Sequence, residues 1–245
     1  MSAWFIADLH LDPGRPEGFD AMRASLDVIA RDGGPLYILG DLFEMWIGDD
    51  DDDPFTQACC DVLAAFARAR PLFTLHGNRD FLTGAGFAAR TGATLLPDPT
   101  VVTLPGGRAA LLLHGDSLCI DDVDYQRVRA QLRAPAWQAD ILARPLAERR
   151  AIGQGMRAQS RAANANTPAA ITDVNEEAVA RVAREHGVEL IIHGHTHRPA
   201  THHRQGATPH TRIVLGDWTP HGQLLRVDDD GRFQLLGSAS LHRAH

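Results

Sequence analysis

Histidine and carboxylate residues recur at the ends of short apolar runs in this chain, and the clearest case lies near its C-terminal end. Leu190-Ile191-Ile192 predicts a short buried strand, and His195 and His197 follow it. Two imidazoles that are two residues apart can both turn toward one point beyond the strand, where a metal could bind. A histidine pair in a loop is often merely solvated, so this stretch alone leaves metal binding open.

The same arrangement occurs four times upstream. Trp4-Phe5-Ile6-Ala7 leads to Asp8 and His10, Leu36-Tyr37-Ile38-Leu39 to Asp41, Leu72-Phe73-Thr74-Leu75 to Asn78, and Ala110-Leu111-Leu112-Leu113 to His114. Each member by itself has an ordinary explanation, such as a helix cap for Asp41, a turn for Asn78 or a core position for His114. Recurrence at five strand ends favours one shared site, because loops beyond the carboxyl ends of an open α/β sheet converge on one crevice.

Seven oxygen and nitrogen donors and no sulfur would meet there. That number exceeds the four ligands of a tetrahedral ion and suits two ions that share Asp41 as a bridge. Imidazole and carboxylate without thiolate favour Mn²⁺, with Fe or Zn less favoured. Two ions about 3.5 to 4 Å apart can deprotonate a water molecule and hold both oxygens of an in-line phosphoryl displacement. The remaining histidines considered, which are His76, His193, His202, His203, His210 and His221, are expected to be structural or surface groups.

The segments between these strands alternate as in an α/β protein. Apolar residues at helical spacing predict an amphipathic helix over 19–31, and further helices are expected over about 55–69 and 82–91. Strand, helix and strand in this order indicate a parallel sheet with right-handed crossovers. A hairpin is expected around Pro105. Asp173 is typical of a helix start, for a helix that runs to His186, and three antiparallel strands are expected between 212 and 236.

Residues 123–163 interrupt this alternation. Apolar residues there recur at helical intervals with Pro135 and Pro145 between them, which predicts two or three short helices and no strand. We expect a helical insertion that caps the sheet edge, with 1–122 and 164–245 as the core. The segment holds eight arginines against three acids, a charge of +5, whereas the rest of the chain sums to −12. Such a face is either solvated surface or a surface that meets anionic groups.

Composition narrows the class of protein. The 245 residues suffice for one large domain or a domain with a cap, and the formal charge of −7 disfavours a general nucleic-acid binder. The three cysteines have neither disulfide nor zinc spacing and are expected to be small buried hydrophobes. No apolar run is long enough to span a bilayer and the first residues lack a signal peptide, so we expect a cytoplasmic chain. The acidic run 49–53 is expected to be a solvated loop.

The motifs resemble those of the calcineurin-like metallophosphoesterases. The shared blocks are Asp8-x-His10, Gly40-Asp41-x-x-Glu44, Gly77-Asn78-Arg79-Asp80, His114-Gly115-Asp116 and Gly194-His195-x-His197. Narrower blocks resemble the UDP-2,3-diacylglucosamine hydrolases of lipid A synthesis over nearly the whole chain. These are Gly40-Asp41-Leu42-Phe43-Glu44-x-Trp46, His114-Gly115-Asp116-Ser117-Leu118-Cys119-x-Asp121-Asp122, Asp173-Val174-Asn175 and Leu215-Gly216-Asp217-Trp218.

This resemblance implies a four-layer α/β/β/α fold and an enzyme that hydrolyses the pyrophosphate bond of UDP-2,3-diacylglucosamine. Metal-activated water would attack the α-phosphorus and release UMP and 2,3-diacylglucosamine 1-phosphate (lipid X). Of two Mn²⁺ ions, one would be held by Asp8, His10, Asp41 and His197, and the other by Asp41, Asn78, His114 and His195. Catalytic roles would fall to Asn78, Arg79, His114 and His195, and substrate contacts to Asn78, Arg79, Asp122, Ser160, Asn164, Thr167 and His195.

One of these positions departs from the family pattern. The family usually has lysine where this chain has Thr167, so a cationic contact is missing there, and Arg157 and Arg161 are the candidates to replace it. The implied partners are a UDP-linked diacylated lipid and the cytoplasmic face of the inner membrane, where the enzyme would be peripheral, with neither nucleic acid nor an obligate protein partner.

Two other functions are compatible with parts of the pattern. One is a different dinuclear metallophosphoesterase, such as a nucleotide pyrophosphatase or phosphodiesterase. The other is a binding scaffold that lost its chemistry, which the presence of all seven ligands disfavours. Arg79 bears on this choice, because many relatives that expel an alkoxide have a histidine there to protonate the leaving oxygen. Arginine cannot donate a proton near pH 7 but can neutralise a departing phosphate, which favours cleavage of a pyrophosphate.

Overall fold

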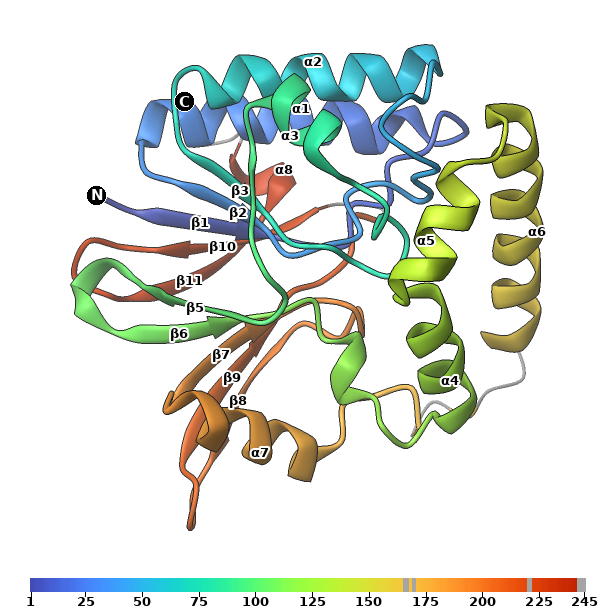
Figure 1. Cartoon of the computed structure of the whole chain (residues 1–245). Helices are drawn as coiled ribbons and strands as arrows, with labels where there is room; N and C mark the ends of the chain where they lie inside the picture. Colours follow the sequence, from blue (N-terminus) through green and yellow to red (C-terminus); the bar gives the residue numbers. More distant parts are fainter. Residues whose placement is uncertain (165–167, 169–170, 220–221, 242–245) are drawn as a thin grey trace.

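Two β-sheets lie face to face in the computed structural model, which describes residues 1–164, 168, 171–219 and 222–241 (Figure 1). The six-stranded sheet contains, in spatial order, β11 (Phe233–Gly237), β10 (Gln223–Val227), β1 (Ala3–Ile6), β2 (Leu36–Ile38), β3 (Leu72–Thr74) and β4 (Thr94–Leu95). The five-stranded sheet contains β5 (Thr100–Thr103), β6 (Ala109–Leu112), β7 (Leu190–His193), β9 (His210–Val214) and β8 (Ala200–Arg204).

The strands that carry the predicted ligands are parallel neighbours. β1 pairs with β2 and β2 with β3, so that Phe5, Tyr37 and Phe73 lie in one row across the sheet. In the other sheet β6 pairs in parallel with β7. Parallel neighbours end at the same edge of a sheet, so the loops that follow these strands lie on the same side of the molecule.

Three apolar clusters separate four layers. Alternate side chains of β1 point to opposite faces: Trp4 and Ile6 lie under the helices, whereas Ala3 and Phe5 lie between the sheets. Helices α1 (Pro16–Asp32), α2 (Pro54–Ala67) and α3 (Ala85–Thr91) cover the six-stranded sheet, and α7 (Glu176–His186) covers the five-stranded one (Figure 1). The short α8 (Ser238–Leu241) contacts α1. The predicted four-layer α/β/β/α fold is therefore confirmed.

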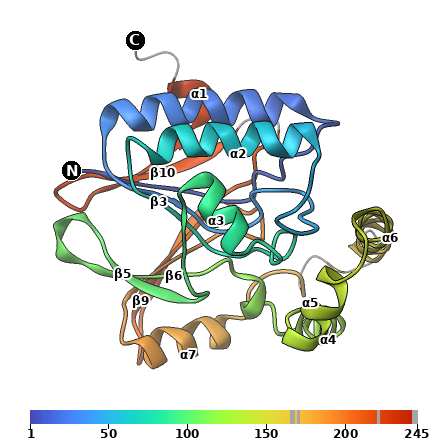
Figure 2. The ribbon, with the colours of Figure 1, turned by 45° about the horizontal axis from the view of Figure 1, so that its top comes forward.

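Three helices occupy the segment predicted as an insertion. They are α4 (Val123–Leu132), α5 (Pro135–Leu142) and α6 (Leu146–Asn164), and they lie beside the sandwich at the end where β1 and β2 terminate (Figures 1 and 2). Two of them are short as expected, but α6 has 19 residues. That 123–163 forms a unit separate from the core stays a prediction. None of the described helices is both long and apolar enough to cross a bilayer.

The C-terminal strands differ from the prediction. β9 was expected to pair with the strands after it, but it lies between β7 and β8 in the other sheet. β8 was not predicted, because its sequence Ala-Thr-His-His-Arg lacks the apolar alternation of a half-buried strand and its residues are mostly exposed. The β10 and β11 hairpin is confirmed. The predicted hairpin around Pro105 is also confirmed, with a 3-10 turn η1 (Pro105–Gly107) between β5 and β6.

Candidate metal centre

The loops that follow five strands, three in one sheet and two in the other, meet at one place. Asp8 and His10 follow β1, Asp41 follows β2, Asn78 follows β3, His114 follows β6, and His195 and His197 follow β7. Backbone hydrogen bonds join the loops, from Asp8 N to Gly40 O at 3.1 Å and from Gly194 N to His114 O at 2.9 Å. The single crevice expected at the edge of one open sheet is thus built from two sheets.

The backbone of these loops is strained where the predicted ligands lie. Within the described residues, the non-glycine residues with positive φ are Asp8, His10, Asp41, His195 and His197. Side chains other than glycine avoid this left-handed region at a cost of about 1 to 3 kcal/mol each, and such residues cluster at functional sites. Five of the seven predicted ligands therefore adopt a conformation that serves the position of the side chain rather than local stability.

Glycines beside the ligands allow the close approach. A Cβ atom on Gly77 would lie 2.0 Å from Asp41 Oδ1, and one on Gly194 would lie 2.2 Å from Asp8 Oδ2. Real Cβ atoms do not approach other atoms so closely. The recurring glycine next to a ligand in the sequence is explained by this contact between neighbouring loops.

Two buried aspartates each use one oxygen for the backbone and present the other to the site. Asp8 Oδ2 accepts a hydrogen bond from His195 N at 2.8 Å, and Asp41 Oδ1 accepts one from Arg79 N at 2.8 Å. Asp8 Oδ1 is buried and has no hydrogen-bond donor among the described residues. A buried carboxylate oxygen without a donor is costly unless a cation satisfies it.

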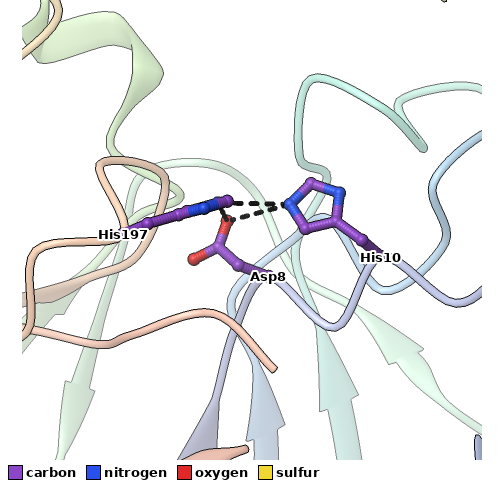
Figure 3. Close-up of side chains that lie close together, drawn as sticks. All are labelled: Asp8, His10 and His197. Carbon is purple, nitrogen blue, oxygen red and sulfur yellow. Dashed lines mark hydrogen bonds and ion pairs between the residues drawn. The ribbon is translucent and has the colours of Figure 1, made fainter. Parts of the chain in front are cut away.

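One group of donors surrounds Asp8. Its Oδ1 lies 3.5 Å from His197 Nε2 and 4.0 Å from His10 Nε2, and the two imidazole nitrogens are 3.2 Å apart (Figure 3). The other ring nitrogens face carboxylates, since His10 Nδ1 lies 2.8 Å from Glu44 Oε2 and His197 Nδ1 lies 3.7 Å from Asp217 Oδ2. Carboxylates in this position orient a metal-binding imidazole and increase its basicity.

A second group surrounds Asn78. Its Oδ1 lies 2.9 Å from His114 Nε2 and 3.0 Å from His195 Nδ1. The Leu39 carbonyl accepts a hydrogen bond from His114 Nδ1 at 2.9 Å, which turns Nε2 toward the site. Asp41 Oδ2 lies between the two groups, 3.6 Å from His114 Nε2 and 3.8 Å from His10 Nε2. The structure thus brings all seven predicted ligands together, with Asp41 at the position of a bridge.

Burial and charge shift the pKa values of these groups in opposite directions. Burial alone would lower the pKa of His114, but Asp41, Asp8 and Asp116 raise it to about 9. Burial and the neighbouring His114 lower the pKa of His195 to about 3. The surrounding carboxylates therefore favour positive charge at His114, whereas His195 stays neutral. The neutral imidazole is the form that binds a metal.

The donor set fits divalent metal ions. Asp8, His10 and His197 form one group of metal-ligand type, and Asp8, Asp41 and His114 form another, each with its donor atoms within 4.8 Å of one another. All of these donor atoms are oxygen or nitrogen, and one of them is Asp8 Oδ1, which accepts no hydrogen bond from the described residues. Mixed oxygen and imidazole donors suit Mn²⁺, Fe or Zn.

The predicted substrate contacts are brought together only in part. Arg79 Nη2 donates a hydrogen bond to Ser160 Oγ on α6 at 3.4 Å, and its buried Nε has no acceptor among the described residues. Asp122 instead caps α4, where its side chain accepts from Tyr125 N at 3.0 Å. The side chain of Asn164 and all of Thr167 lie outside the described residues.

Several residues around the ligands had no role in the sequence prediction. Asp80 is buried and accepts hydrogen bonds from Gly77 N at 2.8 Å and Leu42 N at 2.7 Å, which holds two ligand loops together. Asp116, within the 3-10 turn η2 (Asp116–Leu118), is buried and accepts from Tyr125 Oη at 2.9 Å and from Arg129 Nε at 2.7 Å. The Tyr125 ring lies 5.9 Å from that of His195. Asp80 and Asp116 each follow a predicted ligand within a sequence motif, and this position is the signal that could have identified them.

The acidic run 49–53 was expected to be a solvated loop; Asp49, Asp50 and Asp52 are exposed as expected, but all five acids have partners. Asp49 accepts hydrogen bonds from Gly84 N and Gly86 N, and Asp53 caps α2. Asp50 pairs with the buried Arg149 of α6. Asp51 lies 2.7 Å from Arg150, and Asp52 lies 2.5 Å from it. The run is therefore the surface on which the N-terminal half of α6 is held.

The prediction that the three cysteines are small buried groups is confirmed. Cys59, Cys60 and Cys119 are free and buried. Burial raises the pKa of Cys59 and Cys119 to about 12 and that of Cys60 to about 11. The thiols are therefore protonated at neutral pH and behave as small apolar groups.

Comparison with known proteins places this geometry in a family. The family of calcineurin-like phosphoesterases matches residues 1–199. A UDP-2,3-diacylglucosamine hydrolase of Cellvibrio japonicus (strain Ueda107) is 50% identical over 234 residues, which are 94% of this chain and 97% of that protein. One of Chromohalobacter salexigens is 47% identical over 250 residues, with both chains covered completely.

Solved structures add the fold alone. A dimetal phosphatase of Danio rerio matches with a TM-score of 0.53 and 14% identity, covering 97% of this chain and 95% of that one. The family match spans all five ligand loops and the full-length relatives span the insertion as well. The chain belongs to the calcineurin-like phosphoesterase family, and within it to the family of the UDP-2,3-diacylglucosamine hydrolases.

Proposed function

We propose that this chain hydrolyses the pyrophosphate bond of UDP-2,3-diacylglucosamine in lipid A synthesis. The products are UMP and 2,3-diacylglucosamine 1-phosphate (lipid X), formed by attack of water on the α-phosphorus. Relatives named for this hydrolysis are 47% to 50% identical over nearly their whole length, which supports the substrate. The observation that carries the reaction type is the convergence of seven oxygen and nitrogen donors, five of them on strained backbone.

The proposed cofactor is a pair of Mn²⁺ ions. Asp8, His10, Asp41 and His197 would hold one ion, and Asp41, Asn78, His114 and His195 the other. Asp41 Oδ2 supports the shared role, because it lies within 3.8 Å of an imidazole of each group. When bound, two such ions would supply Lewis acidity and lower the pKa of water.

The chain itself would supply orientation and charge. Arg79 is anchored to the site through its backbone N–H, which donates to Asp41, while its guanidinium reaches Ser160 on α6. A guanidinium there would bind the diphosphate and neutralise the departing sugar phosphate, which needs no proton. Asp122, Asn164, Thr167 and His195 complete the proposed substrate contacts.

We further propose that the enzyme works at the cytoplasmic face of the inner membrane as a peripheral protein. Ile120, Val123 and Val128 at and near α4 are 41%, 62% and 48% exposed, and Arg127 lies among them. Exposed apolar side chains interspersed with arginine suit the boundary of an anionic bilayer. Sedimentation with anionic vesicles tests this, because binding that weakens with salt supports it and exclusion at every salt concentration contradicts it.

The decisive experiment uses the purified chain with Mn²⁺ and UDP-2,3-diacylglucosamine, and in parallel a generic aryl phosphodiester. We expect UMP and lipid X from the lipid substrate. Release of product from the aryl ester alone would instead indicate a different metallophosphoesterase, such as a nucleotide pyrophosphatase or phosphodiesterase. No product from either substrate, at full Mn²⁺ occupancy, would refute hydrolysis.

A further inference from the structure

A chain of ion pairs runs from the insertion into the candidate metal centre. Arg157, on α6, lies with its Nη2 2.5 Å from Glu44 Oε1. The other carboxylate oxygen, Glu44 Oε2, lies 2.8 Å from His10 Nδ1. His10 Nε2, on the far side of the same ring, lies among Asp8, Asp41 and His197. One carboxylate therefore connects a helix of the insertion to a predicted metal ligand.

The same guanidinium has a second anchor. Arg157 Nη1 lies 3.1 Å from Asp12 Oδ2, in the loop that carries His10. The side chains of Arg157 and Asp12 are 23% exposed and that of Glu44 is 14% exposed. These pairs are sheltered enough to hold a defined geometry, unlike pairs at the open surface. Position 157 thus contacts both the loop of His10 and the carboxylate behind it.

The pairing has a direct consequence for His10. A carboxylate beside one ring nitrogen orients the ring, turns the other nitrogen toward the metal and raises its basicity. Arg157 holds one oxygen of the Glu44 carboxylate while the other oxygen faces His10, so the guanidinium fixes the orientation of that carboxylate.

We propose that Glu44 and Arg157 are positioning residues that couple the placement of α6 to metal affinity at His10. The proposal rests on the metal centre of the proposed function, but not on its substrate. A coupling between two events is reciprocal, so metal binding at His10 also favours the placement of α6 seen here. His114, in the other group, has no carboxylate in this position, because its second nitrogen faces the Leu39 carbonyl.

The test uses Mn²⁺ alone and compares Arg157→Gln with Arg150→Gln. Both arginines lie on α6 and both variants lose one charge, but Arg150 pairs with Asp51 and Asp52 and does not reach the centre. Free Mn²⁺ is followed by its electron paramagnetic resonance signal during titration. We expect Arg157→Gln to bind one of two equivalents about 10-fold more weakly, the lower end of the effect of such partners. Arg150→Gln should match the parent protein.

Hydrogen exchange of 146–164 gives an independent measure. Adding Mn²⁺ should slow exchange there in the parent protein and in Arg150→Gln, and should have little effect in Arg157→Gln. Glu44→Gln should lose the same coupling. Thermal unfolding without metal checks that each variant is folded.

Equal Mn²⁺ affinity in the parent protein and Arg157→Gln would overturn the proposal, as would an equal loss in Arg150→Gln. Neither measurement contains substrate. A chain that fails to release UMP could still show the coupling, and an active enzyme could lack it, so the two proposals fail separately.

Discussion

The ligand loops and the helical insertion are held in this molecule by different interactions. The loops are joined by backbone hydrogen bonds between strand ends, and glycines allow them to touch. The insertion is joined to the sandwich largely by arginines, with Arg149 on Asp50, Arg157 on Glu44 and Arg129 on Asp116. Contacts between backbones leave no room for an added atom, whereas each arginine pair depends on one side chain that a substitution can remove. The two regions should therefore respond to different kinds of substitution.

The largest expected effect comes from disturbing a backbone contact. Gly77→Ala places a Cβ atom 2.0 Å from Asp41 Oδ1 and 2.2 Å from Asp41 N, so Asp41 has to move. We expect Mn²⁺ affinity to fall about 10- to 100-fold. At saturating Mn²⁺, turnover should fall by a further factor of about 10², the loss expected when a group in the active site is displaced by about 1 Å. Metal analysis of the purified variant measures the loss of Mn²⁺ affinity, and the rate of UMP release measures the loss of turnover.

The matched control for that change is a glycine of the insertion. A Cβ atom on Gly155 of α6 meets nothing within 4 Å. Gly155→Ala should therefore leave metal binding and turnover unchanged, and should stabilise the helix by about 0.5 to 1 kcal/mol. If Gly77→Ala and Gly155→Ala behaved alike, the distinction between the two regions would be lost.

The second-largest effect is expected at Arg79, which contacts both the ligand loops and the insertion. Arg79→Ala removes a guanidinium that contacts Ser160 of α6 but none of the seven metal-ligand donor atoms, and the backbone N–H that holds Asp41 remains. Turnover should fall about 10²- to 10³-fold, the loss typical for removal of one donor to a developing charge. Metal content should stay intact. Ser160→Ala is the control, with a smaller loss; near-normal turnover by Arg79→Ala would contradict its role.

The ligand loops could be predicted from sequence because their information is local. Each ligand follows an apolar strand within a few residues, and the glycine next to it is needed for contact between loops. The family resemblance then supplied the four layers, which spacing alone did not. The expectation of one open sheet predicted that these side chains converge, but the strands that carry them belong to two sheets. Parallel strands of two facing sheets bring their loops to the same side in much the same way.

The attachments of the insertion could not be predicted in this way. Arg149 and Asp50 are 99 residues apart in the chain, as are Arg150 and Asp51. A run of five acids and a helix with scattered arginines each look like ordinary solvated surface until the fold places one on the other. β8 was missed for a related reason, because an exposed edge strand has no apolar pattern.

The third prediction tests whether arginine pairs hold the insertion. Arg149 is buried, and its Nη1 donates to Ile47 O at 2.7 Å as well as to Asp50. Arg149→Met keeps the length of the side chain but leaves that carbonyl and carboxylate without their donor. We expect a loss of about 1 to 2 kcal/mol, limited because Asp50 is 65% exposed. Hydrogen exchange should increase in α6 and stay unchanged in β1, β2 and β3; an increase throughout the chain would contradict a local attachment.

The smallest effect separates the charge of the insertion from its attachment. Arg144 pairs with Asp140 at 2.9 Å and Glu148 at 2.6 Å, and both acids belong to the insertion itself. Such exposed pairs contribute little to stability, so Arg144→Gln should leave the melting temperature and exchange in α6 unchanged. It still lowers the positive charge of the segment from +5 to +4. If net charge draws the enzyme to anionic vesicles, binding to the vesicles should weaken slightly at low salt in this variant. A lower melting temperature instead would mean that pairs within the insertion also stabilise it.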